Sequence, residues 1–336
     1  MNDFHGIRTP VITKTPLRVS FLGGGTDLPE FFLKHGSGAV LGTTVNKYLF
    51  HSVIPFHSDL FDYSLRLSYS RVECVKSIDD IEHAPFRECL RYLGISKDIE
   101  IDLASELPSF AGMGSSSSFV VGLLNALLAF QGKTIPKMDL AYAAIEIERG
   151  ILREAVGCQD QVFAAVGGLN VIEFSSNRNI IVNRIPMTPE RAAEFESYLM
   201  LFFTGIRRKA VEVEEKKIRN MDNISNVFKL MLPLVDKGYR ILTGNGQLSE
   251  FGYLLHETWH LKRQLEKDVS NSEIENLYET AILAGALGGK LLGAGGGGFM
   301  LLFVPPEKQD KVRRELTRYH EIKVEINTPG STVIYS

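Results

Sequence analysis

Residues 108–118 have the sequence "PSFAGMGSSSS", which has the composition of a flexible linker. The alternation of apolar and polar residues from Ile99 to Leu107 predicts a strand directly before it, and the apolar run from Phe119 to Phe130 predicts a helix after it. A linker separates independent units, whereas this stretch lies inside one strand-loop-helix unit. We therefore interpret it as a loop with a chemical role.

The composition of this loop suits an anion. Gly112 and Gly114 allow backbone conformations in which successive N–H groups point the same way. The serines from Ser115 to Ser118 begin the predicted helix, whose N-terminus carries partial positive charge. No lysine follows Gly114, so the loop is not a Walker A motif. The loop predicts a phosphate cradle with hydroxyls available for Mg²⁺, although serines also serve as ordinary helix caps.

Two further stretches are rich in glycine. Residues 18–32, "RVSFLGGGTDLPEFF", run from a strand into a predicted helix, with Asp27 at its start as a ligand-binding group or an N-cap. Residues 290–304, "KLLGAGGGGFMLLFV", contain the spacing G-x-G-x-x-G. A dinucleotide site needs a strand before and a helix after this spacing, and here the order is reversed. We interpret this stretch as a loop that approaches a bulky group closely, or as a packing turn.

Periodicity places further elements around these loops. Strands are predicted at Leu17–Leu22, Ala39–Val45, Tyr48–Ile54, Leu65–Tyr69, Ile99–Leu107, Leu169–Phe174, Ser197–Thr204, Phe299–Val304 and Glu321–Ile326. Helices are predicted at Ile78–Leu93, Ser116–Gln131, Met138–Leu152, Asn226–Leu242, Leu248–Leu265 and Ser272–Leu287. Ser272 and Glu275 form a capping-box pattern. The absence of regular βα alternation favours an α+β fold, and turn residues at Pro186–Glu190 predict domains 1–187 and 188–336.

Composition excludes several function classes. The chain has 336 residues and a net charge of -3, which gives no general attraction to nucleic acid or an anionic membrane. Three cysteines without a CxxC pair and an N-terminus without an apolar run favour a reducing cytoplasm. The apolar segment Ala281–Val304 is not expected to span a membrane, because Lys290 and several glycines interrupt it.

The sequence "HETWH", residues 256–260, matches the zinc motif H-E-x-x-H. On a helix it would place His256 and His260 on one face, with Glu257 as a base. A zinc metalloprotease is therefore an alternative of a different class. It leaves all three glycine stretches unexplained, and two surface histidines on a helix are the simpler interpretation.

Taken in this order and spacing, the three glycine stretches resemble the three motifs of the GHMP small-molecule kinases, which include galactokinase and mevalonate kinase. "PSFAGMGSSSS" is similar to the family's P-x-x-x-G-L-G-S-S-A loop, with Met113 in place of leucine. The resemblance implies an N-terminal domain like ribosomal protein S5 domain 2 and a ferredoxin-like C-terminal domain. It also implies an ATP site between them.

The resemblance implies a role for individual residues. The phosphates of ATP would contact Gly112, Met113, Gly114, Ser115, Ser116, Ser117, Gly295 and Gly296. Ser116 would bind Mg²⁺ together with Glu148 of "EIERG". Asp160 of "GCQDQ" resembles the catalytic aspartate, and Arg18 resembles the basic residue that ends the first motif. Asp160 would accept the proton of a sugar hydroxyl, and Arg18 would meet the charge of the transferring phosphoryl group.

The first motif also indicates what kind of sugar the chain would bind. Galactokinases have Gly-Glu-His-Thr-Asp where this chain has "GGGTD", and glycine removes both bulk and negative charge. A longer sugar that ends in phosphate would then fit without repulsion. The expected sugar-binding residues are Gly24, Gly25, Thr26 and Asp27. The expected phosphate-binding residues are Arg207 or Arg208 of "TGIRRKA", with Lys262 and Arg263 as a second candidate pair.

The "GGGTDLP" form is most similar to family members that act on D-glycero-D-manno-heptose 7-phosphate. The resemblance implies a cytoplasmic sugar 1-kinase that uses ATP and Mg²⁺ and serves capsule or lipopolysaccharide synthesis. A fucose- or galactose-type sugar 1-kinase is the nearest alternative, and a non-catalytic sugar sensor on the same fold is another. A homodimer is compatible with the sequence, which contains no argument for or against it.

Overall fold

The computed structural model describes residues 9–108, 112–206, 210–266 and 269–336, and the structural statements below concern these residues. Two long antiparallel strands, β1 (Val11–Leu22) and β2 (Ser37–Pro55), form the centre of the first sheet. Two separate strands were expected within β2. The strand instead continues past the polar residues Asn46 and Lys47, because β1 pairs with residues on both sides of them across a shift in register.

The first sheet has strands from both ends of the chain. The others are β3 (Leu65–Ser68), β4 (Val72–Val75), β5 (Ile99–Ser105), β6 (Leu169–Ser175), β7 (Ile180–Arg184) and β12 (Thr332–Tyr335). Their order is β12-β1-β2-β5-β3-β4, with β6 between β2 and β7. The last strand, inside the predicted second domain, therefore returns to the sheet of the first.

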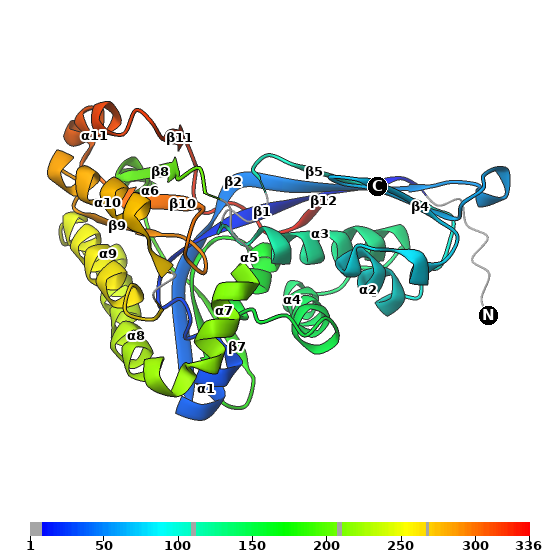
Figure 1. Cartoon of the computed structure of the whole chain (residues 1–336), viewed down its shortest axis with the longest axis horizontal. Coiled ribbons are helices and arrows are strands. Elements are labelled where there is room, and N and C mark those ends of the chain that lie inside the picture. The colour runs from blue at the N-terminus through cyan, green and yellow to red at the C-terminus, as the bar shows by residue number, and fades with distance from the viewer. Residues whose placement is uncertain (1–8, 109–111, 207–209, 267–268) are drawn as a thin grey trace.

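Helices cover this sheet. They are α1 (Pro29–His35), α2 (Ala84–Tyr92), α3 (Ser115–Phe130), α4 (Lys137–Ile145), a π-helix (Glu146–Ile151) and α5 (Gln159–Val166). Helices α3 and α5 pack on β1 and β2, and α2 and α4 flank α3 (Figure 1). The predicted helix Ile78–Leu93 is divided into a 3-10 turn, Ile78–Asp80, and α2, because Pro85 lacks the N–H that a continuous helix needs.

The second sheet is smaller and antiparallel. Its strands are β8 (Leu199–Phe203), β9 (Gly288–Leu291), β10 (Phe299–Phe303) and β11 (His320–Ile322), in the order β11-β8-β10-β9. This sheet and the helices that accompany it are here called the second half of the molecule, and the first sheet with its helices the first half. The helices of the second half are α6 (Pro189–Ser197), α7 (Ala210–Arg219), α8 (Met221–Thr243), α9 (Ser249–Lys262), α10 (Ser272–Ala284) and α11 (Gln309–Glu315). Short 3-10 turns lie at Ser58–Leu60 and Pro306–Lys308. The predicted capping box is wrong, because the cap of α10 is Asn271, whose side chain accepts a hydrogen bond from the Ile274 N–H at 3.0 Å.

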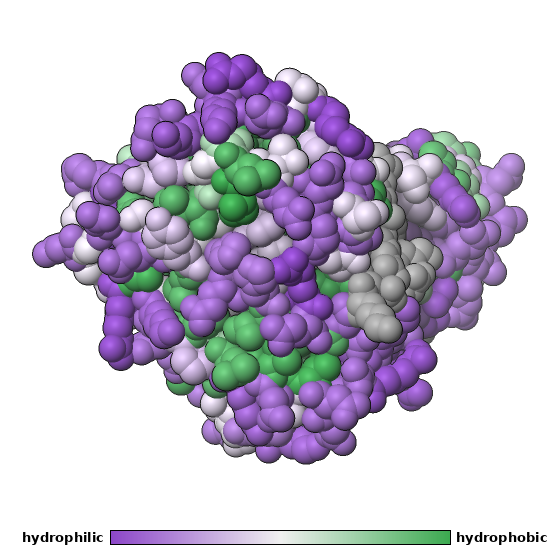
Figure 2. Space-filling view, turned by 60° about the vertical axis from the view of Figure 1, so that its left-hand side comes forward, coloured by the Kyte–Doolittle hydropathy of each residue, from purple (hydrophilic) through white to green (hydrophobic). Residues whose placement is uncertain are grey.

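The two halves share their apolar core. The ring of Phe21 on β1 packs edge-on against Phe195 and Phe251, with centroids 5.5 and 5.6 Å apart. Phe31 on α1 packs in the same way against Phe228 of α8 at 5.3 Å. On the face shown in Figure 2 the surface is mostly hydrophilic, with the apolar residues in separate groups. The shared core fixes the glycine turn after β1 against the helices of the second half.

The segment Ala281–Val304 is divided between the end of α10, β9 and β10. Gly285 ends α10 with a φ of 118°, a conformation that residues other than glycine rarely adopt. Within the ranges that the structure describes, no helix combines the length and the apolar character needed to cross a membrane.

Adjacent glycines of the first motif are expected to respond differently to substitution. Gly23 has a φ of +75°, and a Cβ there would lie 2.0 Å from the Ala39 carbonyl oxygen. Backbone strain of about 1–3 kcal/mol and overpacking of a similar size should destabilise Gly23→Ala. A Cβ at Gly24 would meet only Ser20 Oγ at 3.5 Å and Gln159 Nε2 at 3.9 Å, so Gly24→Ala should keep wild-type stability. Urea unfolding of both variants tests this, and equal stabilities would contradict it.

Candidate active site

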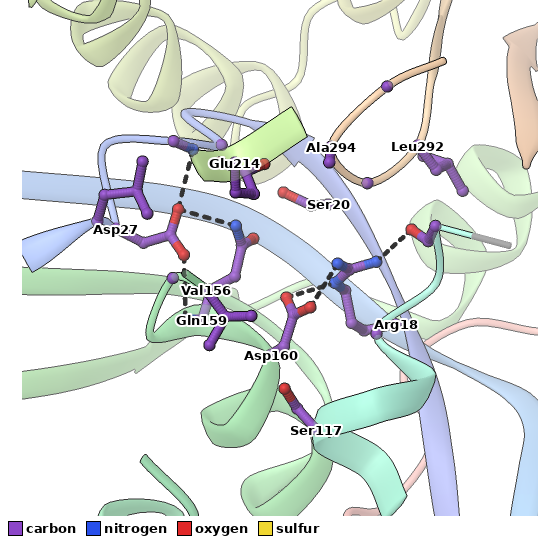
Figure 3. A pocket seen from close by; sticks show the side chains of 18 of the residues that line it. Arg18, Ser20, Asp27, Ser117, Val156, Gln159, Asp160, Glu214, Leu292 and Ala294 are labelled. Atoms are coloured by element: carbon purple, nitrogen blue, oxygen red, sulfur yellow. Dashed lines mark hydrogen bonds and ion pairs between the residues drawn. The ribbon is translucent and has the colours of Figure 1, made fainter. Parts of the chain in front are cut away.

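A pocket lies where the three glycine stretches converge (Figure 3). Its walls come from β1 and the turn after it, the loop before α3, the start of α5, helices α7 and α9, and the loop after β9. The first half contributes most of the carboxylates, and the second half contributes three lysines. The site therefore exists only when the two halves are packed together.

Arg18 and Asp160 form an ion pair in this pocket. Arg18 Nε donates to Asp160 Oδ1 at 2.7 Å, and Nη2 donates to Oδ2 at 2.6 Å. The third guanidinium nitrogen donates to the Gly112 carbonyl at 2.6 Å, and the Arg18 N–H donates to the Met113 carbonyl at 3.0 Å. Such a two-pronged contact fixes the carboxylate geometrically. The expected catalytic pair is thus brought together, and Arg18 also anchors the glycine loop.

The loop before α3 opens onto the pocket. Gly114 is the N-cap of α3 in a left-handed conformation, and no side chain of the described residues caps the helix, so Ser115 to Ser118 do not act as caps. The first intrahelical bond runs from the Ser118 N–H to the Gly114 carbonyl at 2.9 Å. The N–H groups that precede it in the first turn have no intrahelical partner and favour an anion. Gly112, Gly114, Ser115, Ser116 and Ser117 line the pocket as expected, whereas Met113 is buried in the core.

The third glycine stretch packs directly on this loop. A Cβ on Gly293 would lie 2.5 Å from the Cα of Gly112, so glycine is required for the contact. Gly295 lines the pocket, as expected. Gly296 does not, because its N–H turns away and donates to the Val269 carbonyl at 2.9 Å.

Glu148 lies behind the first turn of α3. Its fully buried carboxylate accepts hydrogen bonds from Ser117 Oγ at 2.8 and 3.1 Å and from Gln161 Nε2 at 2.5 Å. Burial raises the pKa of Glu148 to about 8. Ser116, the expected partner of Glu148, lies exposed on the pocket wall, and it is Ser117 that contacts the carboxylate. A buried carboxylate beside a hydroxyl offers oxygen donors of the kind that Mg²⁺ prefers.

Asp27 accepts three hydrogen bonds at the other end of the pocket. The donors are the Gly25 N–H at 2.9 Å, the Gln159 N–H at 3.2 Å and Gln159 Nε2 at 2.9 Å. It does not cap α1, whose N-cap is Leu28. Burial, and then the charge of Asp160, raises the pKa of Asp27 to about 6. Asp27 is thereby held rigidly, facing the same space as Asp160.

Thr26 has a different position from the one expected. Its hydroxyl donates to the carbonyls of Gly23 and Ala39, both at 2.8 Å, and the residue is fully buried. The short polar side chain serves the tight turn and not the pocket. Gln159 was not expected in the site, although it lies in the quoted "GCQDQ" motif. Gln159 Oε1 and Ser20 Oγ are buried pocket-wall atoms that lack a hydrogen-bond partner within the described ranges. Both can bind a hydroxylated ligand.

Three lysines in the pocket wall were not predicted as a group. They are Lys217 of α7, Lys262 of α9 and Lys290 of β9, with exposed fractions of 3, 5 and 3 %. The expected phosphate ligands Arg207 and Arg208 lie outside the described residues. Arg263 pairs with Glu275 and is not part of the pocket wall.

The "HETWH" histidines contact one another away from the pocket. His256 Nε2 and His260 Nε2 are 2.9 Å apart, and His256 Nδ1 lies 2.6 Å from the Tyr278 hydroxyl. Glu257 is exposed. Among the described residues, no group of three or more His, Cys, Asp and Glu side chains is placed to hold a metal ion.

Comparison with known proteins agrees with this geometry. The descriptions "GHMP kinases N terminal domain" and "GHMP kinases C terminal" match residues 75–168 and 239–322. The chain is 31% identical to a D-glycero-alpha-D-manno-heptose 7-phosphate kinase of Campylobacter jejuni over 317 residues, which cover 91% of this chain and 93% of that protein. The chain belongs to the GHMP kinase family. It is therefore an ATP-dependent phosphotransferase, and the metalloprotease alternative is wrong.

Two other relatives are more distant. A bifunctional fucokinase/GDP-fucose pyrophosphorylase of Arabidopsis thaliana is 26% identical over 349 residues, covering 96% of this chain and 32% of that protein. The solved structure of a D-glycero-D-manno-heptose 1-phosphate kinase from Bacteroides thetaiotaomicron has a TM-score of 0.72 at 24% identity, covering 97% of this chain and all of that one. The expected two-domain GHMP kinase fold is confirmed.

The raised pKa of Asp27 predicts a pH-dependent stability. In the folded protein the carboxyl group of Asp27 loses its proton near pH 6, whereas in the unfolded chain it loses the proton near pH 3.8. The free energy of unfolding should therefore fall by roughly 2 kcal/mol as the pH rises from about 4 to 7, and stay level above about pH 7. Asp27→Asn should remove this contribution, so the difference in unfolding free energy between wild type and variant should change over this range. Parallel urea-unfolding profiles from pH 4 to 7 would contradict the assignment.

Proposed function

We propose that the chain transfers the γ-phosphoryl group of ATP to the anomeric hydroxyl of D-glycero-D-manno-heptose 7-phosphate, giving heptose 1,7-bisphosphate and ADP. The observation that carries the proposal is a pocket that combines carboxylates for hydroxyl groups with cations for phosphates. The similarity to the Campylobacter jejuni heptose 7-phosphate kinase over most of both chains supports it. The product would enter activated-heptose synthesis for surface polysaccharide in the cytoplasm.

The nucleotide phosphates are assigned to the first turn of α3. The N–H groups there and the helix dipole neutralise negative charge without needing to reorganise. Arg18 lies beside this turn, held by the Gly112 and Met113 carbonyls. As charge accumulates on the oxygens of the transferring group, Arg18 is placed to stabilise it.

The acceptor hydroxyl is assigned to Asp160. Both carboxylate oxygens of Asp160 accept hydrogen bonds from Arg18. Arg18 therefore fixes the orientation of this carboxylate and neutralises its charge before the substrate binds. Asp160 orients the hydroxyl and accepts its proton as the bond to phosphorus forms. Sugar hydroxyls further from the reacting centre contact Asp27, Gln159 and Ser20, and Gly24 leaves space beside them.

We assign Mg²⁺ to Ser116 on the pocket wall and to Glu148, which lies behind the first turn of α3 with its carboxylate held in place by Ser117. The ion would supply charge neutralisation for the nucleotide phosphates. Glu148 is the group that anchors it, since within the described ranges no lysine or arginine forms an ion pair with this buried carboxylate.

The alternative substrate class is an unphosphorylated fucose- or galactose-type sugar. Steady-state assays with ATP, Mg²⁺ and a panel of free and phosphorylated sugars decide between them. We expect kcat/KM for heptose 7-phosphate to exceed that for the free heptose at least 100-fold, because charge-assisted contacts to phosphate contribute a few kcal/mol. Equal efficiency for both would support the alternative. Asp160→Asn is the control, expected to bind ATP but to lose at least 100-fold in kcat. A wild-type chain without turnover on any sugar would favour the sugar sensor.

Glu148→Gln should raise the Mg²⁺ concentration for half-maximal activity at least 10-fold, because it removes the anionic ligand. Since the amide keeps the shape and part of the hydrogen bonding to Ser117 and Gln161, the loss of stability should stay within about 1–2 kcal/mol. The matched control is Glu154→Gln, a nearby half-buried carboxylate that does not line the pocket. An unchanged Mg²⁺ requirement in Glu148→Gln would remove Glu148 from the metal site.

A further inference from the structure

Three ammonium groups from separate elements of the second half converge on one side of the pocket. Lys217, Lys262 and Lys290, here called the lysine cluster, are all at least 95% buried. Lysine keeps its charged end in solvent wherever the fold permits, so three buried lysines at one site are unusual. Burial takes each charged group out of water, which costs free energy.

The partners of the lysine cluster are mostly neutral. Lys217 Nζ contacts Glu214 Oε1 and the Ala294 carbonyl, each at 2.9 Å. Lys262 Nζ donates to the carbonyls of Leu291 at 2.7 Å and Gly293 at 2.6 Å, and Lys290 Nζ donates to the Phe21 carbonyl at 2.9 Å. In the part of the chain that the structure describes, neither Lys262 nor Lys290 forms an ion pair. Two buried amino groups therefore have no carboxylate among the described residues to stabilise their charged form.

A buried charge costs free energy unless a group of opposite charge lies beside it. Burial lowers the pKa of Lys290 to about 7, and the charges of Arg18 and Lys217 add to this effect. Burial also lowers the pKa of Lys262 well below its usual range, with Lys290 and Lys217 as the next causes. The fold holds mutually repelling amino groups in place, which is the arrangement expected of an anion-binding site.

We propose that the lysine cluster binds the phosphate ester of the acceptor sugar and so selects phosphorylated over free sugars. This inference rests on the proposed function, because it assigns a subsite for the substrate of the same pocket. Glu214 compensates Lys217, which leaves Lys262 and Lys290, within the described ranges, as two amino groups that a phosphate can hold in their charged form. A phosphate monoester carries about -1.5 to -2 at neutral pH and matches them.

The position of the cluster favours the acceptor over the nucleotide. Asp27 acts electrostatically on Lys290, and Glu214 acts on both Lys262 and Asp27. Figure 3 shows Glu214 and Asp27 on the same side of the pocket, away from Ser117 at the first turn of α3. The lysine cluster thus adjoins the hydroxyl-binding carboxylates, whereas the nucleotide phosphates have their own donors on α3. One ligand with both hydroxyls and a phosphate accounts for this pairing.

The test compares Lys262→Met and Lys290→Met with Lys237→Met, a control on the exposed face of α8. We expect kcat/KM for heptose 7-phosphate to fall at least 50-fold in the cluster variants, and kcat/KM for the free heptose to fall at least ten times less. KM for ATP should not change. Equal losses with both acceptors, or a raised KM for ATP, would assign the cluster to the nucleotide and overturn the proposal. Thermal unfolding of each variant confirms that it is folded.

Calorimetry without ATP gives an independent readout. Binding of heptose 7-phosphate to wild type at pH 7.5 should take up protons, seen as a dependence of the enthalpy on the buffer, because the phosphate restores the charge of Lys290. This uptake should be smaller in Lys290→Met, and an unchanged uptake would contradict the assignment of Lys290. If wild type binds the sugar phosphate in this way but transfers no phosphoryl group, the proposed function fails and the subsite stands. If wild type and both variants bind it equally, or wild type does not bind it, the subsite is wrong.

Discussion

The site depends on the contact of Arg18 with Asp160. Through one guanidinium group, β1 is tied to α5 by a two-pronged ion pair and to the loop before α3 by the Gly112 carbonyl. The third glycine stretch packs on Gly112 at a distance that only glycine permits, so its place depends on the same anchor. The first turn of α3, the catalytic carboxylate and the glycine loop after β9 therefore have one common reference point.

Around this pair, the pocket is divided by charge. Asp27 and Glu148 are buried carboxylates whose pKa values are raised, and Lys262 and Lys290 are buried ammonium groups whose pKa values are lowered. Both directions have the same physical cause, since burial disfavours whichever form is charged. Ionisable groups with shifted pKa values cluster at functional sites, where a ligand can supply the opposite charge. The acids come from one half of the fold and the lysines from the other, and the shared aromatic core holds them at fixed separation.

The sequence predicted those parts of the fold that depend on local pattern. The strand-loop-helix unit around Gly112 and Gly114 was expected from motif and periodicity, and the resemblance implied that Arg18 and Asp160 both belong to the site, although not that they form an ion pair. Features that depend on contacts between distant residues were not expected. Thr26 bonds to Ala39 on the far side of α1, and β2 continues through two polar residues because it pairs with β1. The lysine cluster was missed for the same reason, because its members are far apart in sequence and only the packing of α7, α9 and β9 brings them together. The cap of α10 was missed for a different reason, because Asn271 and its neighbour Ser272 can both cap a helix.

The measurement that tests this account most directly is a crystal structure of the chain with a non-hydrolysable ATP analogue, Mg²⁺ and heptose 7-phosphate. We expect the nucleotide phosphates to lie at the first turn of α3 and the anomeric hydroxyl to lie beside Asp160. The sugar phosphate would then contact Lys262 and Lys290. Nucleotide phosphates on the lysine cluster, or a sugar whose anomeric hydroxyl points away from Asp160, would contradict it.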